Sequence, residues 1–360
     1  MIQSQIATGV PWQRTVGAVV LAIIVSGVVL AVAHMNPFQA YGALVSGAFF
    51  TPLAIGTTLA DALPLMLVGV GVAITFQAGL VNIGGEAQYV VGSIAAALVG
   101  IAFAHMAGPL HIALALLAAM VAGAILGLVP GVLKAYFSVN EIVSTLMLSY
   151  ASVYFANYLL QAGPMSVSPY LQQSANIPAS AIIPALIPGT QISWGLLLAP
   201  AAALGVAWFL RQTRTGFSIR MMGQNLSAAR YAGAPVGILT VVALTLAGAL
   251  GGLGGGVEVL GNFHVLYDSF ADNYGFDAFV VALMARNNPW GVLLVALLFG
   301  ALESGGSAMQ ASTGVTAAMI DVVEGLIIFF IAADRIVAWA TDRRRARAGS
   351  GTSPAEEVQA

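Results

Sequence analysis

Runs of apolar residues long enough to cross a lipid bilayer recur along the whole chain. A bilayer core of about 30 Å needs roughly 20 helical residues. Hydrophobic residues make up 59% of the 360 positions and charged residues 7%, against about 25% charged residues in a soluble domain. We therefore predict an all-α integral membrane protein with about ten transmembrane helices. The predicted spans are residues 16–34, 60–77, 83–104, 111–133, 141–161, 193–210, 237–257, 275–286, 289–303 and 316–338, the eighth and ninth being short.

The positions of the twelve lysines and arginines predict the orientation. If the N-terminus is cytoplasmic and the chain crosses at each run, all twelve lie on or next to the cytoplasmic side, as the positive-inside rule requires. The outer loops then carry Glu258, Asp268 and Asp272 instead. Both termini are expected to be cytoplasmic. Residues 16–34 are predicted to be a span and not a cleaved signal peptide, because the run exceeds the usual 7 to 15 apolar residues.

The remaining segments suggest one membrane domain with a tail. Residues 1–340 are predicted to form a single transmembrane domain, within which the short aromatic stretch 38–50 lies along the outer interface. Residues 341–360, a basic cluster followed by Gly, Ser, Pro and Glu, read as a disordered cytoplasmic tail. Ten crossings would allow a possible inverted five-plus-five repeat, although the two glycine-rich, acid-bearing stretches 79–87 and 248–261 align poorly.

Catalytic chemistry finds little support in the sequence. The glycines between Gly251 and Gly256 cannot form a nucleotide-binding P-loop, because the only lysine is Lys134. Small residues that let membrane helices pack closely are the better interpretation. The four histidines lack metal-ligand spacing, and the stretch from Glu303 to Gly306 reads as a loop after the ninth span. We expect no catalytic residue, no metal and no cofactor.

Acidic residues at membrane depth are costly and therefore suggest function. Asp321 and Glu324 are spaced i, i+3, so they share one face of the last predicted span. They would either line a polar cavity or bond to neighbouring helices. Asp61 is expected at the outer boundary of the second span.

Two short polar segments resemble helix starts. Ser138 and Glu141 have the spacing of a capping box at the start of the fifth span. The segment from Asn82 to Glu86 predicts either a helix capped by Asn82 or a helix break that lines a pathway.

The loop 211–235 is the most informative part of the sequence. It contains four arginines and no acid, and it is too long for a plain turn. Within it, Asn225 to Gly233 predicts a short helix that Asn225 caps and Gly233 ends. Such a helix would dock into a groove on a cytoplasmic partner. The alternative is a basic loop held against anionic lipid headgroups.

Three separated segments carry a resemblance to a known family. They read FQAGLVNIGGEAQ at 76–88, NEIVSTLMLSY at 140–150 and GQNLSAARYAGAP at 223–235. The chain resembles permease subunits of bacterial ABC importers over most of residues 15–340. It is most similar to the simple-sugar and nucleoside branch of the branched-chain amino acid and ribose permease superfamily. Ser149 departs from the pattern, since the family has Asn before Tyr150.

The resemblance implies a ten-helix subunit of the bacterial inner membrane. It implies as partners a second, related permease, two cytoplasmic ATPase subunits and an external substrate-binding protein, and no nucleic acid. The segment 225–233 would be the coupling helix that inserts into the ATPase. Its contact residues would be Asn225, Leu226, Ala229, Arg230, Tyr231 and Gly233. Within the family, the stretch 140–148 favours nucleosides over simple sugars as substrate.

We further hypothesise that ATP-driven rocking opens a central path alternately to the two sides of the membrane. An aromatic ring can stack on a base or sugar, and amides can bond hydroxyls. The residues expected along this path are Phe76, Asn82, Glu86, Gln88, Asp321 and Glu324. The rival hypothesis is a secondary transporter that couples to ions through Asp61, Asp321 or Glu324.

Overall fold

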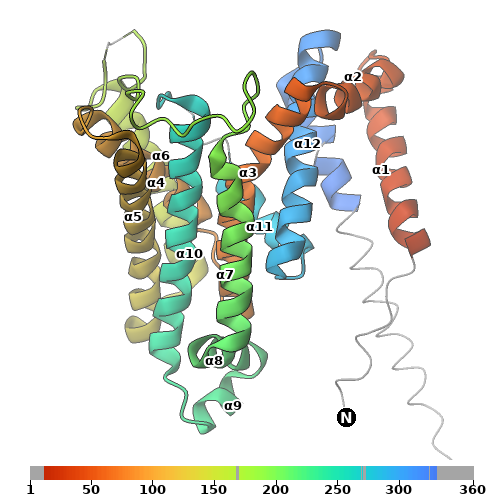
Figure 1. Cartoon of the computed structure of the whole chain (residues 1–360). Helices are drawn as coiled ribbons and strands as arrows, with labels where there is room; N and C mark the ends of the chain where they lie inside the picture. Colours follow the sequence, from red (N-terminus) through yellow and green to blue (C-terminus); the bar gives the residue numbers. More distant parts are fainter. Residues whose placement is uncertain (1–11, 168–169, 269, 271–272, 324, 331–360) are drawn as a thin grey trace, which may run out of the picture. The chain divides into compact units, whose positions relative to one another are not determined.

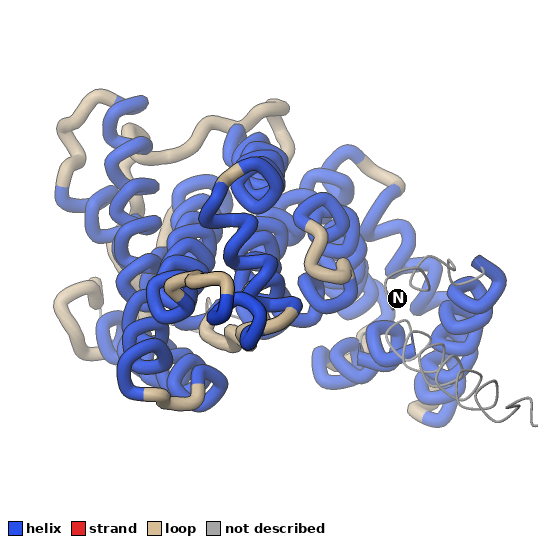
Figure 2. Tube along the Cα trace, turned by 90° about the horizontal axis from the view of Figure 1, so that it is seen from below, coloured by secondary structure: helices blue, strands red, loops and turns tan. Residues whose placement is uncertain are grey.

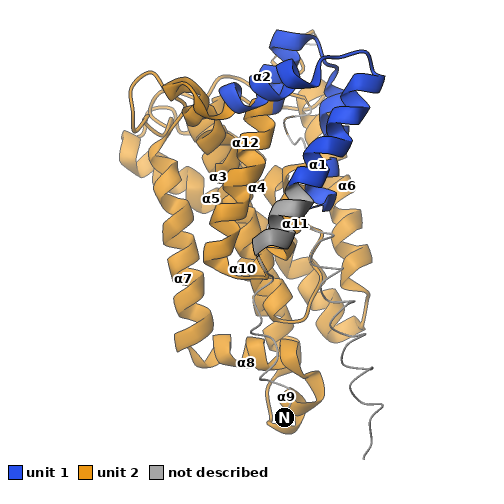
Figure 3. Ribbon diagram, turned by 90° about the vertical axis from the view of Figure 1, so that its right-hand side faces the viewer, with its two compact units in different colours: residues 1–47, 306–360 blue, residues 48–305 orange. Residues whose placement is uncertain are grey.

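The structure is a computed structural model that describes residues 12–167, 170–268, 270, 273–323 and 325–330 (Figure 1). In these ranges the regular elements are all helices, and two isolated β-bridges join Gln173 to Tyr267 and Ala185 to Ser193. The predicted all-α class is confirmed. The chain divides into two compact units, residues 1–47 with 306–360 and residues 48–305 (Figure 3).

The first unit is built from the two ends of the chain. It contains α1 (Trp12–Val32), most of α2 (Pro37–Phe49), the end of α12 (Pro289–Thr313) and a helical stretch at 317–323. Tyr41 of α2 donates a hydrogen bond to the carbonyl of Ile23 in α1. The core of this unit consists of Leu30, Ala40, Met309, Val315, Ile320 and Val323. The last predicted span, 316–338, is helical at 317–323 and 325–330, and its end lies outside the described residues.

The second unit holds most of the long apolar helices. They are α3 (Pro52–Gln77), α4 (Gly85–Ala102), α5 (Gly108–Phe137), α6 (Glu141–Gln161), α7 (Leu198–Gln212) and α10 (Val236–Glu258). A 3₁₀ turn (Trp194–Leu197) precedes α7, and a π turn (Val259–Phe263) continues α10. Three shorter helices are α8 (Arg214–Gln224), α9 (Leu226–Tyr231) and α11 (Tyr274–Met284).

With α12, seven helices of the described chain are long and apolar enough to cross a membrane. They correspond to seven of the ten predicted spans. The count of ten and the inverted repeat stay predictions.

Figure 2 shows the helices of the chain from below. In the second unit, glycines let α10 pack closely against α5. A Cβ atom on Gly252 would meet the carbonyl oxygen of Ala119, and one on Gly123 would meet the carbonyl oxygen of Gly248. Side chains at these positions would force the helices apart, because the obstacles are backbone atoms. The interpretation of the glycine-rich stretch as a packing surface is confirmed.

Two predicted helix ends are wrong. α12 continues to Thr313, so the residues from Glu303 to Gly306 are helical and form no loop. Small residues in a membrane helix favour close packing as well as turns, so Gly305 and Gly306 alone do not end α12. α3 begins at Pro52, with Thr51 as its cap, which places Asp61 inside the helix and away from its start.

The predicted capping box is also wrong. Asn140 caps α6 by accepting a hydrogen bond from the N–H of Ile142. Ser138 instead ends α5 in the left-handed conformation, with φ 57°. The N-cap of α6 therefore lies two residues later than a box from Ser138 to Glu141 requires.

Candidate functional site

Two short helices, α8 and α9, connect the end of α7 to the start of α10 at one end of the second unit (Figure 1). Thr213 caps α8 by accepting a hydrogen bond from the N–H of Gly216. Asn225 separates the two helices and caps α9, accepting from the N–H of Ala228 at 3.0 Å. Gly233 follows α9 with φ 77°. The short helix predicted between Asn225 and Gly233 is confirmed.

Some side chains of α9 are buried against the second unit, and others are exposed. Ala229 is fully buried, Leu226 is half-exposed, Arg230 is exposed and Tyr231 is 94% exposed. A large aromatic and a cation therefore project from an anchored helix, which suits a partner groove, since such residues dominate binding energy at interfaces.

The neighbouring helix α8 was missed in the sequence. Its signal is the cap at Thr213 followed by a buried face of Gly216, Ile219 and Met222, spaced by three residues. Gly216 obscured that pattern because glycine lowers helix propensity.

The end of α8 rests directly on the turn that follows α3. A Cβ atom on Gly223 would overlap the carbonyl oxygen of Gln77 and the amide nitrogen of Gly79. Gly79 itself has φ 74°, a conformation that favours glycine. Because backbone meets backbone here, α8 has no room to move toward the turn 78–84 unless that turn moves as well.

A cavity of about 650 Å³ lies behind α9. Leu226 and Arg230 of α9 line it together with the end of α5, the start of α6 and the start of α10. On its wall, the Lys134 Nζ atom lies 2.8 Å from a Glu141 carboxylate oxygen. This ion pair joins the end of α5 to the start of α6.

The turn 78–84 leads into α4 and is held by α6. Asn82 is fully buried, and its Oδ1 atom accepts a hydrogen bond from the N–H of Gly84 at 2.9 Å. Gly84 is the residue that precedes α4, so the prediction of Asn82 as the helix cap is wrong. Thr145 accepts from the N–H of Ile83 at 3.3 Å, and Ser149 donates to the carbonyl of Ile83 at 3.2 Å.

Glu86 connects α4 to α11, far away in the chain. Its buried carboxylate accepts a hydrogen bond of 2.7 Å from the N–H of Gly275 at the start of α11. Phe76, at the end of α3, lies against Phe279 of α11 with ring centroids 5.1 Å apart. Two of the predicted path residues therefore meet the same helix.

Gln88 is buried on α4 against Gly251 of α10. Neither polar atom of its amide has a hydrogen-bond partner, and the Nδ2 atom of Asn82 has none either. Such buried, unpartnered atoms are rare and call for an explanation. Of the other predicted path residues, Asp321 is exposed in the first unit and Glu324 lies outside the described residues.

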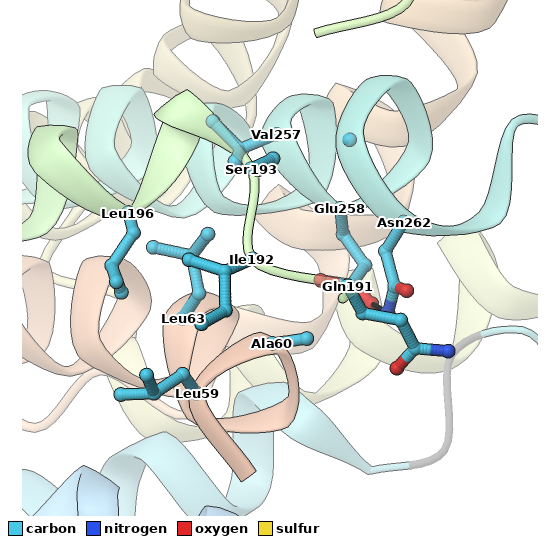
Figure 4. Close-up of a pocket in the computed structure, with 11 residues that line it drawn as sticks. Leu59, Ala60, Leu63, Gln191, Ile192, Ser193, Leu196, Val257, Glu258 and Asn262 are labelled. Atoms are coloured by element: carbon cyan, nitrogen blue, oxygen red, sulfur yellow. Dashed lines mark hydrogen bonds between the residues drawn. The ribbon is translucent and has the colours of Figure 1, made fainter. Parts of the chain in front are cut away.

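The opposite end of α10 carries a polar group that the sequence had placed in a loop. Glu258 is the buried last residue of α10, and Asn262 donates a hydrogen bond of 2.7 Å to its carboxylate (Figure 4). The adjoining pocket measures about 10 Å³, room for no more than one water. Tyr89 of α4 packs nearby against the rings of Phe270 and Tyr274.

A bundle of long apolar helices, with a capped and exposed helix in a basic loop at one end, has the features of a polytopic membrane protein. Residues 54–332 match the family described as branched-chain amino acid transport system / permease component. The chain belongs to this family.

Curated relatives share most of the chain. The guanosine ABC transporter permease protein NupP of Bacillus subtilis is 33% identical over 88% of this chain and 91% of its own length. The glucose ABC transporter permease protein TsgB13 of Haloferax volcanii is 33% identical over 87% and 85%. The nucleoside ABC transporter permease protein NupB of Lactococcus lactis is 30% identical over 89% and 90%. No solved structure is significantly similar.

These findings define the chain as a multi-pass membrane protein and a permease subunit of an ABC transporter. Such a subunit transports and is not itself an enzyme. It works with an ATPase and a substrate-binding protein.

Proposed function

We propose that the chain is the permease subunit of an importer for nucleosides, in which α9 couples ATP hydrolysis to transport. Two of the relatives described above are named for guanosine and nucleosides. Simple sugars are the second candidate, because the glucose permease is as similar as the guanosine permease.

The observation that carries the coupling role is the backbone contact between Gly223 and Gly79. The ATPase would grip α9 through Leu226, Arg230 and Tyr231, while Asn225, Ala229 and Gly233 keep the helix formed and seated. Closure of the ATPase would push α8 against the turn 78–84. The motion would then reach α4 and, through Glu86, α11.

We place the path along the same elements. The Asn82 Nδ2 atom and both polar atoms of the Gln88 amide are candidates to bond a hydroxyl or base of the substrate, since these atoms lack protein partners. Phe76 would stack on the base or sugar, and Glu86 would hold α11 in register. For Asp321 and Glu324, a place on the path stays a prediction from the sequence alone.

The proposed assembly has two ATPase subunits, a second related permease and an external binding protein, in a bacterial inner membrane. The permease domain covers residues 1–340, with the coupling loop 211–235 and the tail 341–360, and both termini are cytoplasmic. The basic loop supports this orientation. A reporter fused after Gly163 should behave as external and one after Gly223 as cytoplasmic. The reverse pattern would exclude the orientation.

Copurification tests the coupling role. The tagged chain is expressed with its neighbouring genes and purified in mild detergent, as wild type and as Arg230→Glu or Tyr231→Ala. Both variants should retain the second permease and lose most of the ATPase. Arg214→Glu, which changes an exposed arginine on α8, is the control and should retain it. Recovery of the chain alone, still transporting, would favour a secondary carrier.

Uptake into cells tests the substrate class. Labelled guanosine should accumulate only when the ATPase is intact, and glucose should not compete. Competition by glucose at equal concentration would favour the sugar branch. Uptake that survives ATP depletion but stops when ion gradients collapse would contradict both the nucleoside and the sugar ABC importer.

A further inference from the structure

Three arginines line a pocket of about 210 Å³ that is separate from the cavity behind α9. Arg211 ends α7, Arg220 lies on α8, and Arg286 lies in the turn between α11 and α12. The other lining residues are Gln77, Ala207, Leu210, Asn287, Asn288 and Pro289. The lining is strongly cationic and contains no acid.

Among the residues that the structure describes, no salt bridge joins these arginines to a carboxylate. Within the described part of the chain, the ion pair between Lys134 and Glu141 is the one salt bridge, and it lies on the other cavity. The Nε–H of Arg220 is buried and has no hydrogen-bond partner. Arg220 is half-buried, whereas Arg211 and Arg286 are exposed. Because a buried N–H without a partner is costly, the pocket is better explained as a site whose anion comes from outside the chain.

The turn that carries Arg286 is unusual and firmly held. Arg286 and Asn287 both adopt left-handed φ values, 54° and 59°, which are uncommon for residues other than glycine. The side-chain N–H of Gln77 donates to the carbonyl of Asn287 at 2.8 Å, tying the turn to the end of α3. Backbone held in such conformations often marks a functional position.

The donor set identifies the class of ligand. Guanidinium groups bind phosphate oxygens with paired hydrogen bonds, and the side-chain amides of Asn287 and Asn288 can add donors to the remaining oxygens. A pocket of this volume holds a phosphate with its ester substituents. We propose that it binds a phosphate group, supplied by an anionic phospholipid or by a soluble phosphate compound.

Binding would have a structural consequence. A phosphate between Arg220 and Arg286 would join α8 of the coupling loop to the turn next to α11, alongside the contact through Gly223. On the orientation proposed above, the lipid would come from the cytoplasmic leaflet, which is rich in anionic headgroups. The anion chemistry itself does not rest on that orientation.

The test uses the copurified transporter after removal of bound lipid. It is placed in nanodiscs of phosphatidylcholine alone or with added phosphatidylglycerol, and retention of phosphatidylglycerol after washing is measured together with the thermal midpoint. A third arm adds inorganic phosphate to the phosphatidylcholine discs. Arg220→Gln and Arg286→Gln remove pocket cations, while Arg214→Gln removes an exposed arginine of α8 that does not line the pocket.

We expect phosphatidylglycerol to stabilise the wild type, and each pocket variant to weaken its retention about tenfold, the effect of one charge-assisted hydrogen bond. Arg214→Gln should retain it. If inorganic phosphate alone stabilises the wild type through Arg220 and Arg286, the source is soluble. If Arg286→Gln does not fold, Arg286→Lys should show an intermediate loss, because it keeps the charge without the paired geometry.

Other results would overturn the proposal. If neither probe stabilises the wild type, or if Arg214→Gln loses as much as the pocket variants, the pocket is no phosphate site. The pocket variants could instead lose the ATPase while their response to phosphatidylglycerol and to inorganic phosphate stays that of the wild type. In that case the arginines bind a carboxylate of the ATPase and not a phosphate. Guanosine uptake by the wild type is measured separately. If uptake is present but the phosphate probes have no effect, the phosphate site fails while the proposed function stands.

Discussion

The two ends of α10 differ in charge and in openness. At its start, near Val236, the second unit carries the basic loop, exposes α9 and contains the cavities of about 650 and 210 Å³. At its other end, Glu258 is buried with Asn262 beside a pocket of about 10 Å³. The basic end is hollow, and the acidic end is packed.

This difference fits the two tasks of an importer subunit. The basic end has to accept a partner and transmit its movement, so it needs exposed anchors and space. The acidic end has to close after a substrate has entered. Close packing of side chains at that end would achieve this.

The largest effect should come from the backbone contact at the basic end. Gly223→Ala places a Cβ atom against the backbone at Gln77 and Gly79, which should cost about 3 kcal/mol of stability or displace α8. Uptake should fall sharply in either case. Gly261→Ala, at the acidic end, meets mainly the side-chain oxygen of Ser193. Its thermal midpoint should drop much less, and an equal drop would remove the contrast between the ends.

Between the two ends, substitutions at Glu86 and Gln88 should have different effects, one on the free energy of unfolding and the other on uptake. Glu86→Leu leaves the N–H of Gly275 without its acceptor and should lower the free energy of unfolding by about 2 kcal/mol. Gln88→Leu removes polar atoms that have no partner, so stability should hold while guanosine uptake falls. Denaturation in mixed micelles and uptake assays measure the two effects. A stability loss at Gln88 as large as at Glu86 would contradict its proposed role in the path.

A smaller effect is expected from the ion pair on the cavity behind α9. Lys134 and Glu141 have side chains 36% and 13% exposed, so solvent screens part of their attraction. Their coupling in a double-mutant cycle of Lys134→Met and Glu141→Gln should be about 0.5 to 1 kcal/mol. A coupling near zero would show that the cavity wall does not depend on this pair.

The smallest effect is a dependence on pH at the acidic end. Burial lowers the pKa of His264, so the folded protein binds fewer protons than the unfolded chain. Stability should therefore fall as the pH drops from about 7.5 through the ordinary histidine pKa of about 6.5. Thermal midpoints of His264→Gln should vary less over this range. His105→Gln, at an exposed position, should behave as the wild type.

The sequence predicted the elements that depend on local signals. Apolar length located seven of the spans, and the cap at Asn225 with Gly233 located α9, because these signals act within a few residues. The glycine-rich stretch predicted close packing for the same reason, since small residues have few other uses at membrane depth. Local errors arose where two signals competed, as with Ser138 and Asn140 at the start of α6.

Contacts between distant segments lay outside what local patterns contain. Glu86 and Gly275 are 189 residues apart, and no spacing rule joins them. Arg211, Arg220 and Arg286 form a pocket only because three helix ends converge. Asn82 resembles a cap by its position, but the turn that contains it is held by Thr145 and Ser149 of α6, which bond to the backbone of Ile83.

The glycine contact between α5 and α10 has a consequence for biogenesis. The two helices face each other through Gly123 and Gly248, so more than one hundred intervening residues have been synthesised before the pair can form. Until α10 has been synthesised, the glycine face of α5 around Gly123 lacks the helix that covers it in the folded protein. A stall in translation within that interval should leave an intermediate open to membrane quality-control proteases, because incompletely packed chains expose the surfaces that folding hides.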